Sequence, residues 1–442
     1  MCTKRTVRTW LWSALVFMFS GIAHAGLPIQ HWQSANGARV YFVESHGLPL
    51  LDVSVDFDAG TRRDTADKSG LAGLTSHMLD LGASGLSEED ISRRLADVGA
   101  QLGATIDPDR AGMTLRTLSS TRERTQALDL MTRILQQPDF PAAALEREKA
   151  RVIAALQEED TQPGPIGQKA FQAALYGTHP YALPGAGKVA TVSRLQQQDL
   201  RDFFRQHYVS ESAVIAIVGD VSRAEAASIA EQLSAGLPRA NGALPPLPEV
   251  TPLPQAETIR LPHPASQSHI LLGMPGMSRS DADYFPLFVG NYILGGGGFA
   301  SRLTEEVREK RGLAYSVYSY FMPLAQPGPF QIGLQTKRDQ ATEALEITLA
   351  TLRRFVAAGP SEAELRHAKQ NLIGSFPLRL DSNRKILGYL SLIGYYNLPL
   401  DYLDQFVKNV DKVTLAEVKS AFRRHIDPEK MVTVIVGGNG EK

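Results

Sequence analysis

The sequence is short of several features that would point to particular classes of protein. It contains a single cysteine, Cys2, among 442 residues, so no disulfide can form within the chain. Neither charge dominates, because 46 basic and 47 acidic side chains give a net charge of −1. This balance argues against nucleic-acid binding, which needs a basic excess to neutralise phosphates, and against an acidic solvating tail. The hydrophobic content of 43% is that of an ordinary globular protein with two or three domains.

The first 25 residues have the layout of a signal peptide. Three basic residues, Lys4, Arg5 and Arg8, precede an apolar run over residues 10–22, and a small-x-small cleavage motif ends at Ala25. The run is too short to span a bilayer comfortably, and the rest of the sequence has no stretch of about 18 apolar residues. We therefore predict a periplasmic or otherwise exported protein, with no membrane span after cleavage near Ala25. Cleavage would also remove Cys2, which suits an oxidising compartment.

A proline-rich segment divides the remaining chain. Six prolines fall between residues 237 and 254, and proline fixes φ and lacks a backbone donor, so we predict an extended linker over residues 237–257. The flanking segments, 26–236 and 258–442, look like distant copies of one unit. Each opens with strand-like alternation, continues with helical periods and closes on a β-branched strand ending in glycine. The fold class predicted is α+β, with two homologous domains that each pack helices on a largely antiparallel sheet.

Individual elements can be placed from the same patterns. Strands are expected at residues 40–43, 51–55, 213–219, 270–272 and 431–437, and amphipathic helices at residues 142–159 and 361–373. A further helix is expected to begin after Ser87, which can cap the helix with Asp90 at the third position. Leu86 and Ile91 then occupy the hydrophobic-staple positions.

One histidine lies on a mostly apolar helical segment over residues 69–82. Leu71, Leu74, Met78 and Leu81 follow helical spacing and predict a buried stripe. His77 lies one turn after Gly73, and such a histidine is usually a hydrogen-bonded residue of a core or interface. A zinc site needs three protein ligands, so His77 alone cannot hold the ion.

Four consecutive glycines, Gly295, Gly296, Gly297 and Gly298, follow a helical segment in the second half. A single glycine after a helix is explained by a tight turn, but four in succession suggest close approach of the backbone to another group. The spacing also matches a dinucleotide fingerprint, which we reject because a helical rather than a strand pattern precedes it.

These segments together resemble the pitrilysin/insulinase family, which includes the mitochondrial processing peptidases and their non-catalytic relatives. In that family the motif His-x-x-Glu-His supplies two zinc ligands and a general base, and a downstream glutamate is the third ligand. Here the first histidine position is Gly73 and the base position is Ser76, so His77 alone remains. The downstream ligand position falls on Ala155, while Glu148 keeps a supporting acidic position. The resemblance implies a chain that binds no zinc and cannot carry out metal-assisted hydrolysis.

The second half resembles the family's glycine-rich substrate loop, Gly295–Gly298, followed by its Arg/Tyr pair. Arg308 and Tyr315 have the family spacing, and there the pair hydrogen-bonds the substrate backbone and the developing oxyanion from outside the zinc domain. The alternative is structural: Arg308 would form a surface ion pair with Glu305 or Glu309, and Tyr315 would be a strand core residue. We expect Arg302 and Arg311 to be structural or solvated.

The function implied by this resemblance is that of a zinc-free subunit in a periplasmic heterodimeric peptidase. A homologous partner would carry the zinc, and this chain would supply Arg308, Tyr315 and the chamber wall for hydrolysis of an unfolded peptide. The alternative is a structural or peptide-binding scaffold with no role in catalysis. A lone peptidase with an unusual metal site is disfavoured by the missing ligands.

Overall fold

The computed structural model describes residues 27–437, so the predicted signal peptide over residues 1–25 lies outside the described residues. The first half contains a six-stranded sheet in the order β1-β2-β8-β3-β7-β6, with β2 and β8 parallel and the other neighbours antiparallel. Its strands are β1 (Gln30–Gln33), β2 (Arg39–Glu44), β3 (Leu50–Phe57), β6 (Gln101–Ile106), β7 (Ala111–Leu118) and β8 (Val214–Gly219). A small hairpin joins β4 (Gly82–Ala83) to β5 (Leu86–Ser87).

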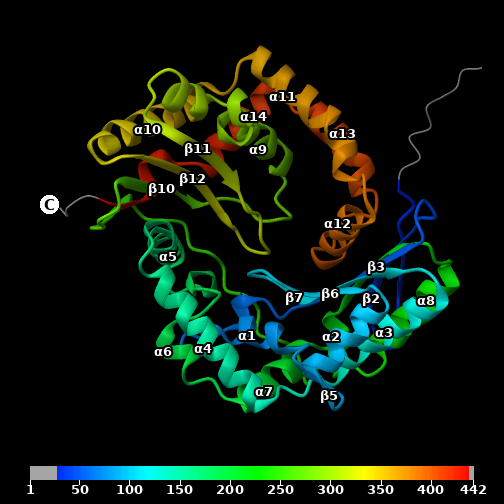
Figure 1. Ribbon diagram of the computed structural model, residues 1–442. Coiled ribbons are helices and arrows are strands. Elements are labelled where there is room, and N and C mark those ends of the chain that lie inside the picture. The colour runs from blue at the N-terminus through cyan, green and yellow to red at the C-terminus, as the bar shows by residue number, and fades with distance from the viewer. Residues whose placement is uncertain (1–26, 438–442) are drawn as a thin grey trace, which may run out of the picture.

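The helices of the first half lie mostly on one side of this sheet (Figure 1). They are α1 (Leu71–Met78), α2 (Glu88–Asp97), α3 (Thr121–Gln136), α4 (Ala142–Glu159), α5 (Pro163–Tyr176), α6 (Val189–Val192), α7 (Gln197–His207) and α8 (Arg223–Ser234). The predicted helix entry at Ser87 is confirmed, because Ser87 and Asp90 cap each other at the start of α2.

The second half contains a five-stranded sheet in the order β11-β12-β10-β13-β9, with β13 and β9 parallel. Its strands are β9 (Glu257–Leu261), β10 (Gln267–Pro275), β11 (Ala314–Phe321), β12 (Pro329–Lys337) and β13 (Val432–Val436). Its helices are α9 (Tyr284–Asn291), α10 (Ala341–Ala358), α11 (Glu362–Gly374), α12 (Asn383–Tyr395), α13 (Tyr402–Lys412) and α14 (Leu415–His425). The predicted α+β class with largely antiparallel sheets is confirmed, as are the predicted strands and the helices at 142–159 and 361–373, the latter within one residue at each end.

Each half lends one helix to the sheet of the other half. Helix α5 packs against β10 and β13, and α12 packs against β2, β3 and β8; Figure 1 shows both crossings. The α12 backbone comes so close to the first sheet that a Cβ at Gly394 would lie 2.5 Å from the Val214 side chain and 2.6 Å from that of Tyr41. The hydrophobic cores are therefore shared, and Tyr41 and Val214 belong to the same cluster as the core of the second half. Within the described chain, the proline-rich residues 237–254 form neither helix nor strand.

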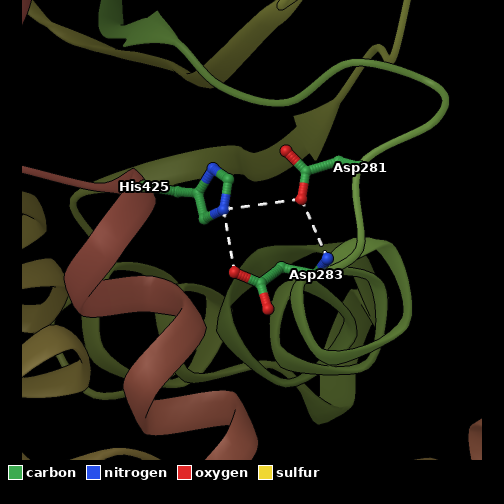
Figure 2. Close-up of side chains that lie close together, drawn as sticks. All are labelled: Asp281, Asp283 and His425. Carbon is green, nitrogen blue, oxygen red and sulfur yellow. Dashed lines mark hydrogen bonds and ion pairs between the residues drawn. The ribbon is translucent and has the colours of Figure 1, made fainter.

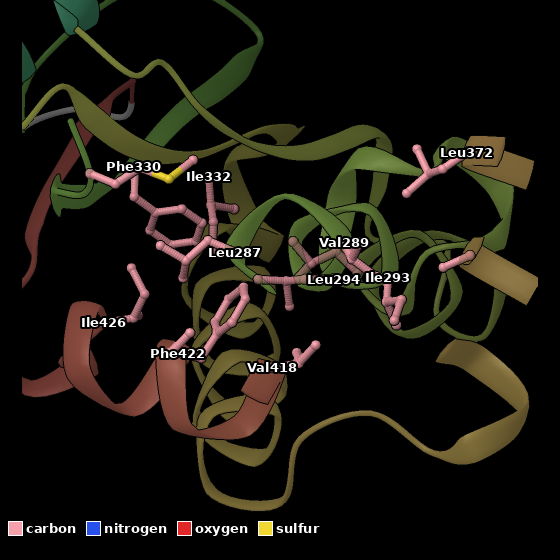
Figure 3. Close-up of a cluster of buried hydrophobic side chains, with 14 of the residues drawn as sticks. Leu287, Val289, Ile293, Leu294, Phe330, Ile332, Leu372, Val418, Phe422 and Ile426 are labelled. Carbon is pink, nitrogen blue, oxygen red and sulfur yellow. The ribbon is translucent and has the colours of Figure 1, made fainter. Parts of the chain in front are cut away.

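The buried core of the second half anchors the chain that leads into the glycine run. Ile293 and Leu294, directly before it, are buried with Leu287 of α9, Phe330 of β12 and Phe422 of α14 (Figure 3). No helix among residues 27–437 is long and apolar enough to cross a membrane.

The turn between β6 and β7 ties the two halves together through Asp109, which is fully buried. Its Oδ1 accepts hydrogen bonds from Arg62 and from the Tyr181 hydroxyl, both at 2.6 Å. Its Oδ2 accepts from the Tyr396 hydroxyl and from the Ala325 backbone N–H, both at 2.7 Å. Burial and the charge of Asp109 raise the pKa of both tyrosines, so their hydroxyls stay protonated donors.

We expect Asp109→Ala to lower the free energy of unfolding by about 3–5 kcal/mol, because it leaves the buried hydroxyls of Tyr181 and Tyr396 and Nη1 of Arg62 without this acceptor. Urea unfolding measures the change. Asp129→Ala is the control, because Asp129 and its partner Arg133 are about half-exposed on α3 and the loss should be about 0.5 kcal/mol or less. A loss below about 1 kcal/mol for Asp109→Ala would contradict the structural role.

Candidate functional site

A cavity of about 530 Å³ lies where the resemblance places the zinc motif. Its wall includes Gly73 and His77 of α1, Arg151 and Val152 of α4, and side chains from α5 and the second half. Helix α1 is held at its start by Asp64, whose carboxylate accepts the backbone N–H groups of Gly70 and Ala72 at 2.7 Å each. Burial raises the pKa of Asp64 to about 7, although the two hydrogen bonds from the backbone act to lower it.

His77 is part of an ion-pair cluster with the ligand helix. Its Nε2 lies 3.0 Å from Glu148 Oε2 and 2.5 Å from Arg151 Nη2. Arg151 Nε also donates to Glu148 at 2.7 Å, and Arg147 Nε lies 3.3 Å from the other carboxylate oxygen. Burial raises the pKa of Glu148, but the hydrogen bonds from Arg151 and Arg147 outweigh it and hold the pKa below its usual value. Arg151 had no place in the sequence argument, although its position one turn after Glu148 could have indicated the contact.

The other two degenerate positions point elsewhere. Ser76 is buried, and its hydroxyl lies 3.5 Å from the carbonyl oxygen of Thr105 on β6. Ala155 is exposed, and it is not among the described residues that line the cavity. The structure thus brings Gly73 and His77 to one cavity but leaves Ala155 outside it.

The residues around the cavity do not fit a zinc ion. His77 is one possible ligand, and Glu148, whose carboxylate lies 3.0 Å from it, is already shared by two guanidinium groups. A guanidinium in contact with both His77 and Glu148 would also repel a divalent cation placed between them. No hydrolytic step can be assigned to a metal held by this chain.

A second group of potential ligands, Asp281, Asp283 and His425, lies at the start of α9 (Figure 2). His425 Nε2 is 3.0 Å from Asp283 Oδ2 and 3.6 Å from Asp281 Oδ1. Arg424 donates to both oxygens of Asp283, at 2.6 and 2.7 Å, so that carboxylate is already neutralised. We interpret this group as an ion-pair cluster that joins α14 to α9.

The glycine run approaches the chain's own backbone. A Cβ at Gly295 would lie 2.6 Å from the Ser319 backbone nitrogen on β11, and one at Gly297 would lie 2.6 Å from the Tyr292 carbonyl oxygen. Gly298 adopts a φ of +59°, which favours glycine. The backbone of the glycine run therefore does approach another group closely, as predicted. That group is β11 and the turn that precedes the run. The substrate-loop role of Gly295–Gly298 stays a prediction.

Arg308 and Tyr315 lie together on the surface. The Arg308 guanidinium carbon is 5.0 Å from the centre of the Tyr315 ring and 4.8 Å from that of Phe299, which follows the glycine run. Tyr315 is 82% exposed and Phe299 is 74% exposed, so the alternative that Tyr315 is a core residue is wrong. Arg308 Nε is 3.4 Å from Glu309, as the surface ion-pair alternative expects. Phe299 was missed by the sequence argument, although a large aromatic residue beside four glycines is a usable signal.

The neighbouring arginines have structural partners. Arg302 donates to both carboxylate oxygens of Glu364, at 2.6 and 2.7 Å, and Arg311 Nη1 lies 2.9 Å from Glu306. Neither Arg308 nor Tyr315 is among the described residues that line the cavity beside His77. The pair therefore forms no part of the wall of this chain's own remnant site.

Comparison with known proteins identifies the family. Residues 39–188 match the model for insulinase (peptidase family M16), and residues 194–372 match the model for the peptidase M16 inactive domain. A crystal structure from Pseudomonas fluorescens, described as a peptidase M16 inactive domain, has a TM-score of 0.90 and 38% sequence identity over 93% of this chain and 98% of that chain. This chain belongs to peptidase family M16.

Two sequence relatives show how this M16 chain stands within the family. The non-peptidase homologue YmxG of Helicobacter pylori is 25% identical, covering 97% of this chain and 98% of the relative. The mitochondrial-processing peptidase subunit beta of Blastocladiella emersonii is 24% identical, covering 91% of this chain and 87% of the relative. The inactive-domain and non-peptidase descriptions support the prediction that this M16 chain has no zinc site of its own.

We expect the purified chain to contain no stoichiometric zinc, because His77 has no second protein ligand free to bind a metal beside it. Elemental analysis after dialysis against micromolar zinc measures the content. His77→Ala should leave the measured zinc unchanged. One equivalent of zinc that disappears in His77→Ala would show that the remnant site binds metal after all.

Proposed function

We propose that this M16 chain is the zinc-free subunit of an exported, periplasmic heterodimeric peptidase. A homologous zinc-bearing partner supplies the metal and the general base, and this chain supplies Arg308, Tyr315 and part of the chamber wall. The substrate is an unfolded peptide. The remnant zinc motif supports the first part of the proposal, since the ligand and base positions hold Gly73, Ser76 and Ala155.

The observation that carries the proposal is the position of the Arg308–Tyr315 pair. The pair is intact in a chain whose own metal site is lost, and its two side chains lie outside the cavity beside His77. The aromatic rings of Phe299 and Tyr315 hold the guanidinium between them at the surface. Exposed aromatic and arginine side chains of this kind are typical of residues that contact a partner or ligand.

The donors of the pair suit the chemistry of peptide hydrolysis. A guanidinium and a phenol hydroxyl can both donate hydrogen bonds to a peptide carbonyl and to the oxyanion that develops from it. An unfolded peptide also has free backbone groups, which can pair with an open sheet edge. Strand β6 is such an edge in the first sheet, and most of its residues are exposed.

A catalytically idle scaffold of the same fold is the competing function. The Arg308–Glu309 contact favours it, because a surface ion pair needs no substrate. The two functions differ in what happens when the pair is altered within an assembled complex.

We expect the chain to co-elute with a zinc-bearing M16 homologue from the same organism. Obligate interfaces commonly bury more than about 2,000 Å², which gives complexes stable at micromolar concentration. Co-expression followed by size-exclusion chromatography measures the association, with each chain run alone as the control. Separate elution at micromolar concentration would contradict the heterodimer.

We expect Tyr315→Phe and Arg308→Lys to reduce turnover by the complex by about 10²–10³-fold, with little effect on assembly. Each change removes a donor that acts mainly in the transition state. Tyr315→Phe keeps the ring, and Arg308→Lys keeps the charge but loses the planar fork. Peptide hydrolysis by the reconstituted complex measures the effect.

Two matched variants control this experiment. Tyr318→Phe removes a hydroxyl from the same strand, and Arg311→Lys alters an arginine paired with Glu306. Both should keep turnover within a few-fold. Full activity of assembled complexes carrying Tyr315→Phe or Arg308→Lys would leave the scaffold function standing.

A further inference from the structure

The cavity beside His77 is enclosed largely by apolar side chains. Phe171 and Leu175 come from α5, Val152 from α4, and Met322 and Leu324 from the loop after β11. Its volume of about 530 Å³ lies within the range of small-ligand sites, roughly 300–1,000 Å³. An apolar group of the size of one or two amino-acid side chains would fill it.

One wall of the cavity carries the guanidinium of Arg151. Arg151 has five N–H donors, and its bonds to Glu148 and His77 involve Nε and Nη2, which leaves Nη1 for a ligand. Its side chain is 62% exposed, so a ligand can reach it. Arg147 lies behind this wall, where its guanidinium contacts Glu148 at 3.3 Å and Glu88 at 2.7 Å. The acidic side chain that lines the cavity, Asp107, is paired with Arg110 at 3.0 Å.

We propose that this cavity binds the C-terminal residue of a peptide, with its apolar side chain in the cavity and its free α-carboxylate on Arg151. The Arg151 guanidinium then lies beside His77. It binds the terminal carboxylate of the peptide at the place where an intact metal site would bind a peptide for cleavage. A planar guanidinium pairs with a carboxylate through two parallel hydrogen bonds, which gives orientation as well as affinity.

This inference rests on the proposed function only for the source of the ligand. Peptide hydrolysis adds water across the C–N bond, so that the amino side receives a proton and the acyl side becomes a new C-terminal carboxylate. A zinc-bearing partner would therefore release fragments with the end that this cavity fits. The site would act as a product-binding site in the same chamber.

The wall also favours a peptide over a simple fatty acid. Ile106, the last residue of edge strand β6, lines the cavity and is 41% exposed. An edge strand offers backbone hydrogen bonds that a peptide can accept and donate and that an alkyl chain cannot. Residues upstream of the bound carboxylate can pair along this edge.

Calorimetry on the purified chain alone tests the proposal with three probes. They are the N-acetylated dipeptide Leu-Phe with a free carboxyl end, the same dipeptide with an amide end, and octanoate. The free acid should bind at least tenfold more tightly than the amide, because a charge-assisted pair is lost. Equal affinity of acid and amide, no binding of the acid at millimolar concentration, or tighter binding of octanoate than of the acid would each overturn the proposal.

Variants locate the site. Arg151→Gln should weaken binding of the free acid by roughly 10- to 100-fold. Arg147→Gln is the matched control, because Arg147 also contacts Glu148 but is not among the described residues that line the cavity, and it should change affinity less than about threefold. Equal losses in both variants would overturn the assignment to Arg151.

Val152→Phe keeps the proposal testable if Arg151→Gln folds poorly. Val152 is half-buried on the cavity wall, so a phenyl ring there takes up the space for the ligand and should abolish binding of the free acid. Unchanged affinity in a folded Val152→Phe chain would overturn the proposal. These measurements need no partner and no turnover, so failure of the heterodimer or of the Arg308–Tyr315 tests would be distinguishable from failure here.

Discussion

The buried carboxylate of Asp109 is the interaction on which the geometry of the site depends. It lies in the turn that follows edge strand β6. Its partners come from the short 3₁₀ helix at Thr61–Arg63, from the chain after α5, from the end of α12 and from the loop after β11. A buried carboxylate keeps its charge only when its acceptor positions are filled, so all these segments must meet at one point. That meeting fixes where β6 ends beside the cavity. Gly60 permits it, because a Cβ there would lie 2.3 Å from the Arg110 backbone nitrogen.

The exchange of α5 and α12 gives the cavity its mixed origin. Since α5 packs on the second sheet while remaining joined to α4, side chains of α4 and α5 meet residues that follow β11. The halves are therefore separate in sequence but not in packing, and neither buries its sheet by itself. A wall built from both halves responds to any change in their relative position.

The sequence predicted what depends on local pattern. Strand alternation, helical periods and the Ser87–Asp90 cap are set by neighbouring residues, so these elements lie where expected. The helix exchange could not be predicted, because an amphipathic helix does not specify which sheet covers its apolar face. The zinc-motif positions were assigned from the resemblance to the family. That resemblance concerns metal ligands, so it gave no prediction for Arg151, which has no role in binding a metal. Phe299 was not predicted for a related reason: the interpretation of this segment rested on its glycines and not on the aromatic ring that contacts Arg308.

Because the metal ligands are lost, the buried carboxylate beside His77 needs a positive partner other than a metal ion. Two arginines of this chain provide it. Glu148 is 6% exposed, and a carboxylate so buried would be costly without a positive partner. Arg151 and Arg147 provide that charge, and their hydrogen bonds keep the carboxylate ionised. An arginine guanidinium is part of the helix and always charged, whereas a metal ion must be bound from solution. The remnant site therefore keeps the Arg151 guanidinium on the cavity wall. A guanidinium can donate hydrogen bonds to oxygen atoms, but it cannot activate water as a bound metal does.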